Sequence, residues 1–209
     1  MSHTPGSGGD FPGGVPWENP ADEKAKRRAE ARAVVAGIPG PVRAAQSLSV
    51  AAWILGSPEW RMAQRVLLYV ASPDEVDLSA LLSAGLSAGK RVCLPAFDGE
   101  HGVYLAREIL DPARDLVPGR FRIPEPGPRC RSLPVAELDL MLVPGLAFDR
   151  GGGRLGRGKG YYDRLLADKR GPVWGVAFRE QLGATLPRES HDQILDGVLT
   201  ADGWIKRTD

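Results

Sequence analysis

The sequence predicts an α/β protein built around a mainly parallel β-sheet. Short apolar runs alternate along the chain with stretches of helical character. The first clear unit reads strand, helix, strand, and such a unit implies two parallel strands joined by a crossover helix. A further apolar run at residues 138–143 leads into a glycine-rich segment and then a predicted helix. Strand, glycine-rich loop and helix in this order present backbone N–H groups to phosphate.

The N-terminal half begins with two predicted helices. Residues 21–36 are polar, rich in alanine and free of glycine and proline, and residues 42–55 are more apolar and stop before Gly56. The strand–helix–strand unit follows, and it consists of a buried-type strand at 65–71, a polar turn at 72–77, a helix at 78–88 and a strand at 91–95.

The C-terminal half is predicted to supply the rest of the sheet. Its strand-like runs are 102–107, 116–121, 138–143, 172–178 and 197–200, with Trp204 and Ile205 extending the last of them. Residues 123–134 are rich in proline and arginine and predict a loop. Residues 160–169 predict the helix that follows the glycine-rich segment.

The composition is that of an ordinary globular protein, with 43% hydrophobic and 25% charged residues among 209. A net charge of +1 creates no overall field that would steer the chain to nucleic acid or membrane. The two cysteines, Cys93 and Cys130, suggest neither a disulfide framework nor a zinc site. Residues 1–20 lack the apolar core of a secretory signal and predict a disordered, Gly/Pro-rich tail. We therefore expect a single cytoplasmic domain over residues 21–209.

The segment from Arg150 to Gly160 carries the strongest functional signal, because it packs six glycines and four basic residues into one stretch. Residues 153–159 match the start of a P-loop, but position 160 is glycine where a P-loop has Ser or Thr. Residues 151–156 match the dinucleotide fingerprint, without a convincing acidic residue about 20 positions on. A glycine-rich surface turn is the alternative. We favour anion binding, because glycines and basic residues come together after an apolar strand.

Acidic residues are predicted to lie near the glycine-rich segment, at the carboxyl ends of the strands. The turn at 72–77 and the glycine segment both follow strands, and parallel sheets bind ligands at the carboxyl ends of their strands. Glu75 can accept hydrogen bonds from ring N–H groups, or it can complement the dipole of the next helix. Asp163 and Asp192 are candidates for magnesium, since no hydroxyl stands at position 160. The alternative for both is a capping or surface role, which the sequence alone favours for Asp192.

The basic residues of the first predicted helix recur every four positions. Lys24, Arg28 and Arg32 share one helix face in this spacing. A solvated charged face is the simpler interpretation of this helix taken by itself.

Residues 142–164, LVPGLAFDRGGGRLGRGKGYYDR, resemble the signature of the 5-formyltetrahydrofolate cyclo-ligase family. Shorter matches follow the family's order, and they are Lys24 with Arg28, Gln46-Ser47, PEW at 58–60, YV at 69–70, DEVD at 74–77, AGKRV at 88–92, and HD at 191–192 before LD at 195–196. The resemblance covers about residues 21–200. It implies a three-layer α/β/α fold similar to the ribose-phosphate isomerase and CoA-transferase group.

The resemblance also implies a cytosolic enzyme that uses ATP and magnesium. Members of the family phosphorylate the formyl oxygen of 5-formyltetrahydrofolate, after which N10 attacks the activated carbon and phosphate leaves. The product is 5,10-methenyltetrahydrofolate. The expected partners are therefore 5-formyltetrahydrofolate and ATP, and we expect a monomer with no nucleic-acid or membrane partner.

Residue roles follow from the resemblance by position. Contacts to ATP are implied for Lys24, Arg28, Arg154, Leu155, Gly156, Arg157, Gly158, Lys159, Gly160, Tyr161 and Tyr162. Arg157 and Lys159 are the implied catalytic residues, since they are best placed to stabilise the transferring phosphoryl group. Contacts to the folate are implied for Val70, Glu75, Arg157, Gly158, Lys159, Gly160 and Tyr161. Magnesium is implied at Asp163 and Asp192.

Three other functions compete with this one. A binding protein that lost catalysis is disfavoured, because Lys24, Glu75, Lys159 and Asp163 are all present. A kinase or ligase for another substrate stays open, since a phosphate site does not name the acceptor. RNA binding through the basic N-terminal helix is disfavoured, because that helix carries no interleaved aromatic residues.

Overall fold

The computed structural model describes residues 20–207 of the chain. Its centre is an eight-stranded sheet, made of β1 (Arg65–Leu67), β2 (Arg91–Asp98), β3 (Val103–Ile109), β6 (Ser132–Leu133), β7 (Leu140–Val143), β10 (Val173–Val176), β12 (Gly197–Thr200) and β13 (Gly203–Lys206). The strand order is β13-β12-β10-β7-β1-β2-β3-β6. The predicted tail at residues 1–20 lies outside the described residues, except for Pro20.

The five central strands of this sheet are parallel. β12, β10, β7, β1 and β2 pair in parallel, whereas β13 on one edge and β3 and β6 on the other are antiparallel. Every residue of β7, β10 and β12 is buried. Such continuous burial is typical of parallel strands that are covered on both faces. The prediction of a mainly parallel sheet is confirmed.

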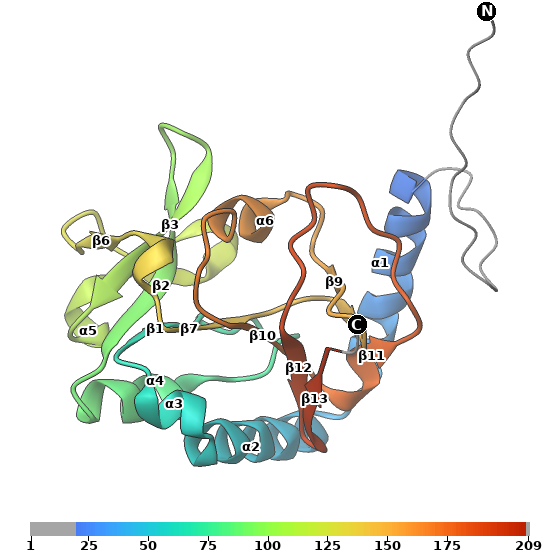
Figure 1. Cartoon of the computed structure of the whole chain (residues 1–209), viewed down its shortest axis with the longest axis horizontal. Helices are drawn as coiled ribbons and strands as arrows, with labels where there is room; N and C mark the ends of the chain where they lie inside the picture. Colours follow the sequence, from blue (N-terminus) through green and yellow to red (C-terminus); the bar gives the residue numbers. More distant parts are fainter. Residues whose placement is uncertain (1–19, 208–209) are drawn as a thin grey trace, which may run out of the picture.

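Helices cover both faces of the sheet (Figure 1). α2 (Gly40–Gly56), α3 (Pro58–Met62) and α4 (Ser79–Ser87) lie together on one face, and α6 (Tyr161–Leu165) lies on the other. Buried side chains form one apolar cluster on each side, the first including Ile54 and Leu81 and the second including Phe148 and Leu166. The predicted three-layer α/β/α fold is confirmed, with one short helix and long loops as its third layer.

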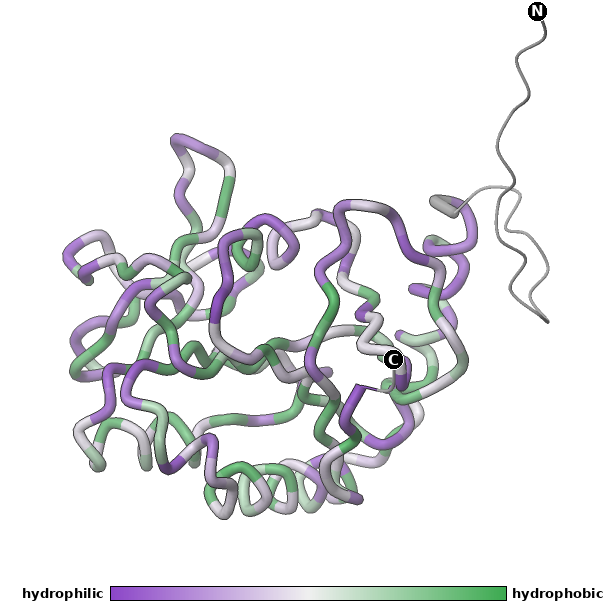
Figure 2. The backbone as a smooth tube through the Cα atoms, viewed as in Figure 1, coloured by the Kyte–Doolittle hydropathy of each residue, from purple (hydrophilic) through white to green (hydrophobic). Residues whose placement is uncertain are grey.

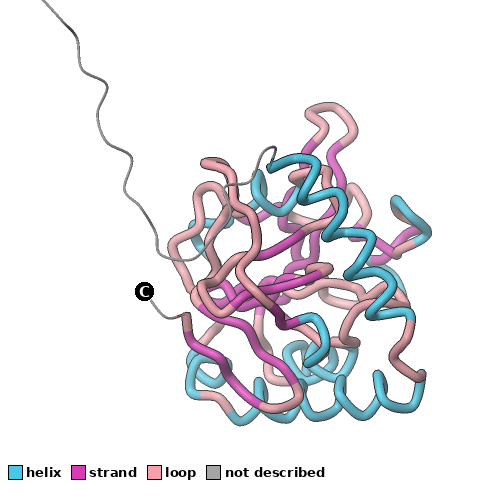
Figure 3. The backbone as a smooth tube through the Cα atoms, turned by 90° about the vertical axis from the view of Figure 1, so that its right-hand side faces the viewer, coloured by secondary structure: helices cyan, strands magenta, loops and turns pink. Residues whose placement is uncertain are grey.

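The loops of that third layer gather on one side of the molecule. Figure 3 shows them above the strands, while the helices of the opposite face form the base of the same view. Figure 2 shows hydrophobic and hydrophilic residues alternating along α2, as expected for a helix with one face on the core. α1 (Pro20–Ala36) stands at the side of the sheet and is mostly hydrophilic.

The helices largely follow the sequence prediction. α1, α2 and α4 begin and end within two residues of the predicted positions. α3 was not predicted, although Ser57 caps it by accepting a hydrogen bond from the Trp60 N–H at 3.1 Å. α6 ends at Leu165 instead of residue 169, because turns after it redirect the chain toward β10. Among residues 20–207, no helix has both the length and the apolar character that a membrane crossing requires.

Two strand predictions need correction. The strand predicted at 65–71 ends at Leu67, because the chain then leaves the sheet and Tyr69 donates its hydroxyl to the Val76 carbonyl at 2.9 Å. The strand predicted at 116–121 ends at Pro118, because Phe121 and Arg122 have φ angles of 57° and 62° that no strand accommodates.

The loop predicted at 123–134 also holds more structure than expected. β4 (Leu116–Pro118) forms a small antiparallel ribbon with β5 (Pro124–Pro126), and the short helix α5 (Pro112–Asp115) precedes it. β6 lies in the same predicted loop and pairs with the outer edge of β3. Its two residues explain why no periodicity revealed it.

Candidate active site

A cleft of about 470 Å³ lies where the parallel strands end. Residues that follow β1 and β7 line it, namely Tyr69 and Val70 after β1 and Pro144 and Gly145 after β7. The rest of its wall comes from α1, the turn at 72–75, β2, β3, the glycine segment, α6, the β4–β5 ribbon and residues 189–192. Open parallel sheets bind ligands at this edge.

The structure brings every predicted site residue to this one cleft. Its lining includes Lys24, Arg28, Val70, Glu75, Arg154, Leu155, Gly156, Arg157, Gly158, Lys159, Gly160, Tyr161, Tyr162, Asp163 and Asp192. These residues come from positions as far apart in the sequence as 24 and 192. Their shared position is a structural fact, whereas the role of each one stays a prediction.

The glycine segment does not run directly from strand to helix. The chain between β7 and α6 contains β8 (Ala147–Asp149) and β9 (Arg154–Leu155), which pair with each other, and β11 (Leu182–Gly183) pairs with β8. Residues 149–153, which we call the inner turn, connect β8 to β9, and Gly151 to Gly153 do not line the cleft. Because Gly153 lies in this turn and not before a helix, neither the P-loop match nor the dinucleotide match describes the segment.

Residues 154–160, which we call the outer arm, line the cleft without a gap. Gly158 and Gly160 have φ angles of 96° and 62°, which favour glycine, and α6 begins directly after Gly160. The side chain of Arg154 is only 4% exposed and donates to Asp163 Oδ1 at 2.9 Å. Its buried Nε has no hydrogen-bond partner in the described part of the chain. Lys159 is exposed.

Arg157 crosses from the outer arm to the acidic turn. Its Nη2 lies 2.8 Å from Asp74 Oδ1 and 3.2 Å from Glu75 Oε1. Burial raises the pKa of Asp74, but Arg157 and Ser72 outweigh burial and bring this pKa below its ordinary value. Because α4 begins only at Ser79, Glu75 does not complement its first turn, and that alternative for Glu75 is wrong.

Lys24 is buried between two carboxylates. Its Nζ lies 2.6 Å from both Glu189 Oε2 and Asp192 Oδ2. Burial lowers the pKa of Lys24, but the hydrogen bonds that Lys24 donates to Asp192 and Glu189 outweigh burial and raise it above its ordinary value. Arg28 donates to the Gly156 carbonyl at 3.0 Å, whereas Arg32 is exposed. The interpretation of this helix face as merely solvated is therefore wrong for Lys24 and Arg28.

Asp163 and Asp192 both line the cleft. The Gln193 N–H, adjacent to Asp192 in the chain, lies 3.4 Å from Asp163 Oδ1. Carboxylate oxygens are the ligands that magnesium prefers. Glu189, His191 and Asp192 bring possible ligand atoms within 4.8 Å of one another, whereas Asp163 does not belong to that group. Sequence reasoning missed Glu189, although it stands just three positions before Asp192.

Tyr104 and Tyr161 form an aromatic part of the wall, of which sequence reasoning assigned only Tyr161. The ring centroids of Tyr104 and Tyr161 lie 5.1 Å apart, and both rings contact Phe97 edge-on. Glu125 is buried and accepts hydrogen bonds from the Phe97 N–H at 2.8 Å and the Arg120 N–H at 3.0 Å. This wall depends on long-range packing of residues 97–125 and carries no local sequence signal.

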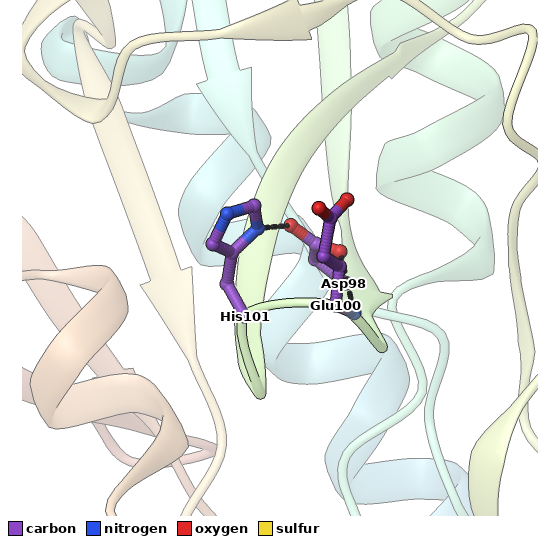
Figure 4. A group of neighbouring side chains, drawn as sticks. All are labelled: Asp98, Glu100 and His101. Carbon is purple, nitrogen blue, oxygen red and sulfur yellow. Dashed lines mark hydrogen bonds and ion pairs between the residues drawn. The ribbon is translucent and has the colours of Figure 1, made fainter.

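A second group of polar side chains lies at the tip of the β2–β3 hairpin (Figure 4). His101 Nδ1 lies 2.6 Å from Asp98 Oδ2, and Asp98 Oδ1 accepts from the Glu100 N–H at 3.1 Å. None of the three lines the cleft. These contacts stabilise a tight turn at the end of two long strands.

The fold and the cleft define an α/β protein with a charged cleft at the carboxyl edge of its sheet. Residues 20–201 match the model of the 5-formyltetrahydrofolate cyclo-ligase family. The chain therefore belongs to the 5-formyltetrahydrofolate cyclo-ligase family and is an enzyme of the ligase class.

Individual relatives agree with this assignment. The 5-formyltetrahydrofolate cyclo-ligase of Mycolicibacterium smegmatis is 36% identical over 171 residues, which cover 78% of this chain and 86% of the relative. The protein of the same name from Escherichia coli K12 is 38% identical over 144 residues, which cover 66% and 79%.

Solved structures show the same fold. The 5,10-methenyltetrahydrofolate synthetase of Aquifex aeolicus superposes with a TM-score of 0.80 at 32% identity, covering 89% of this chain and 93% of that one. The synthetase of Mycoplasma pneumoniae gives a TM-score of 0.69 at 18% identity, with 86% and 99% covered, and supports the fold alone.

Proposed function

We propose that this enzyme converts 5-formyltetrahydrofolate to 5,10-methenyltetrahydrofolate at the expense of ATP, releasing ADP and phosphate. The observation that carries the proposal is that the basic outer arm faces an acidic turn within one cleft. Ligands that carry a hydrogen-bonding ring and a phosphate group would suit such a cleft, with the ring at the acidic turn and the phosphate at the basic arm. The family and the names of its members support the choice of folate.

The chemistry requires activation of an amide-like carbonyl. The formyl oxygen attacks the γ-phosphorus of ATP, and ADP leaves. The N10 lone pair then attacks the activated carbon, and N10 loses its proton. The C–O bond breaks, and phosphate departs with the bonding electrons. The formyl oxygen is a poor leaving group until phosphorylated, so the protein must mainly align the reactants and stabilise developing negative charge.

The residues of the outer arm are proposed to act on the phosphates. Residues 154–162 would surround the nucleotide, and Arg157 and Lys159 would stabilise the transferring phosphoryl group. Lys24 and Arg28 would reach the phosphates from α1. Lys24 now lies between two carboxylates, so a bound nucleotide would compete with them for its ammonium group.

The folate side of the cleft is proposed to begin at the end of β1. Val70 would contact the pterin, and Glu75 would accept hydrogen bonds from its ring N–H groups. Residues 157–161 would border the same ligand. Asp163 and Asp192 would hold magnesium, whose bound charge would offset that of the phosphates.

The proposal also includes the cellular location and the oligomeric state of the enzyme. We place it in the cytoplasm and expect it to act as a monomer. Nucleic acid and membrane have no part in the proposed reaction.

The test is an absorbance assay near neutral pH that follows formation of 5,10-methenyltetrahydrofolate, with and without ATP and magnesium. The proposal predicts a signal that needs both. A folded protein that binds ATP but gives no signal would overturn the folate assignment and favour a kinase or ligase for another substrate.

A further inference from the structure

The three consecutive glycines of the inner turn lie against the protein itself. A Cβ atom on Gly151 would approach Arg188 Nη2, one on Gly152 the Leu195 carbonyl oxygen, and one on Gly153 the Asp149 carboxylate, all closer than 3.0 Å. Gly152 also has a φ of 79°. These glycines therefore let the inner turn pack on residues 186–195, and they do not serve a ligand.

Asp149 is the buried centre of this contact, with a side chain only 3% exposed. Its Oδ1 accepts from the Gly153 N–H at 2.8 Å and from Arg188 Nη2 at 2.9 Å. Its Oδ2 accepts from the Leu186 N–H at 2.9 Å. One carboxylate thus closes the inner turn and holds the start of a distant segment.

The other end of that segment is held by the same turn. The Leu195 N–H donates to the Gly152 carbonyl at 2.9 Å. Residues 186 and 195 are therefore fixed on residues 149–153, and the chain between them carries Glu189 and Asp192 to Lys24. On the other side of the turn, Arg154 follows Gly153 directly and pairs with Asp163.

We propose that Asp149 is a positioning residue for the nucleotide half of the cleft, acting through the inner turn on Arg154 and through Arg188 and Leu186 on Glu189 and Asp192. It does not line the cleft and touches no substrate. Misplacement by about 1 Å can lower a rate by about a hundredfold, so a residue that aligns two ligand-binding segments matters for more than folding. This role rests on the proposed function, because it presupposes a nucleotide in the cleft.

The experiment compares Asp149→Asn with two other variants. Asn keeps one acceptor oxygen but loses the charge that faces Arg188. Arg188→Ala removes that charge pair and leaves both backbone hydrogen bonds of Asp149, which keeps the test valid if the first variant fails to fold. Asp139→Asn is the matched control, because Asp139 also accepts two backbone N–H groups, from Gln64 and Arg65, and does not line the cleft.

Four quantities are measured for each variant. They are the KM for ATP, the KM for 5-formyltetrahydrofolate, the affinity for a non-hydrolysable ATP analogue with magnesium by calorimetry, and the melting temperature. Asp149→Asn should weaken nucleotide binding about tenfold and leave the folate KM within about twofold. Arg188→Ala should weaken nucleotide binding about threefold. Asp139→Asn should lower the melting temperature without changing either KM.

Equal changes in both KM values, or the same nucleotide defect in Asp139→Asn, would show that Asp149 is merely structural. If the wild type binds the nucleotide but turns over no folate, the proposed function fails. The calorimetric comparison then still decides the role of Asp149.

Discussion

The inner turn and the outer arm are adjacent parts of one glycine segment, yet they meet different neighbours. Gly151, Gly152 and Gly153 lie against Arg188, Leu195 and Asp149, and a Cβ atom on Gly152 would clash with the Leu195 carbonyl of the backbone. Gly156, Gly158 and Gly160 line the cleft instead, beside the exposed Lys159. Glycine permits close packing in the first part, and under the proposed function it would let the backbone approach a ligand in the second. The density of glycines in a sequence therefore does not by itself mark a phosphate site.

The largest effect is expected for Lys159→Ala, which tests whether the outer arm acts in catalysis and not in packing. We expect kcat to fall about 10²- to 10³-fold, because a cation near the transferring phosphoryl group acts mainly in the transition state. The free energy of unfolding should change by less than about 0.5 kcal/mol, since Lys159 is exposed. Steady-state kinetics and urea unfolding measure the two effects. Lys26→Ala, another exposed lysine, should alter neither, and normal turnover of Lys159→Ala would remove Lys159 from catalysis.

The converse change is Gly152→Ala in the inner turn. The new methyl group meets the Leu195 carbonyl at a φ that disfavours alanine, so the free energy of unfolding should fall by about 2–3 kcal/mol. Urea unfolding measures the loss. Gly183→Ala is the control, because a Cβ there has open space. A Gly152→Ala protein as stable as the wild type would show that the turn is not tightly packed.

Glu75→Gln tests which ligand is bound by the acidic turn that lies opposite the outer arm. The change removes the negative charge that Arg157 meets at 3.2 Å and weakens an acceptor proposed for the pterin. We expect the KM for 5-formyltetrahydrofolate to rise about tenfold and the KM for ATP to change less than about twofold. A selective rise in the KM for ATP would place Glu75 at the nucleotide instead.

The smallest expected effect concerns pH and the segment that the inner turn holds. The pKa of Asp192 is below its ordinary value, because Lys24 outweighs the opposite effect of burial. The stability that this carboxylate contributes is thus complete above its ordinary pKa and is lost as pH falls through the lower folded value. Asp192→Asn should cost about 1–2 kcal/mol near neutral pH, and the difference from the wild type should vanish in acid. Urea unfolding across pH tests this, and a difference that persists in acid would exclude the charge as its cause.

Much of the fold could be predicted from the sequence, because the relevant signals are local. The buried run at 140–143 and the alternation around residues 65–95 predict parallel strands from their apolar character alone. The early end of β1 could not be predicted, since Leu68 to Ala71 are as apolar as the strand itself. Only tertiary contacts, such as that of Tyr69 with Val76, take the chain out of the sheet.

In the candidate site too, residues with local sequence signals could be predicted and residues that depend on tertiary contacts could not. The outer arm, Asp163 and Lys24 could be proposed from the sequence because they belong to recognisable motifs. Glu125, Tyr104 and Asp149 could not be assigned, since their importance lies in partners that are distant in the chain. The sequence also could not distinguish the glycines of the inner turn, which pack on the protein, from those of the outer arm, which line the cleft. The atoms that would contact a Cβ at each glycine are known only from the structure.

The ion pairs around the cleft have a consequence for how a ligand arrives. The lining carries five basic and five acidic side chains, and Lys24, Arg154 and Arg157 each pair with a carboxylate. Neighbouring opposite charges cancel at distances beyond the Debye length of about 8 Å at physiological ionic strength. Electrostatic steering of an approaching polyanion is therefore weak, and added salt should slow its association only slightly. Under the proposed function, the attraction would act at contact, where phosphate oxygens would compete with the carboxylates for Lys24, Arg154 and Arg157.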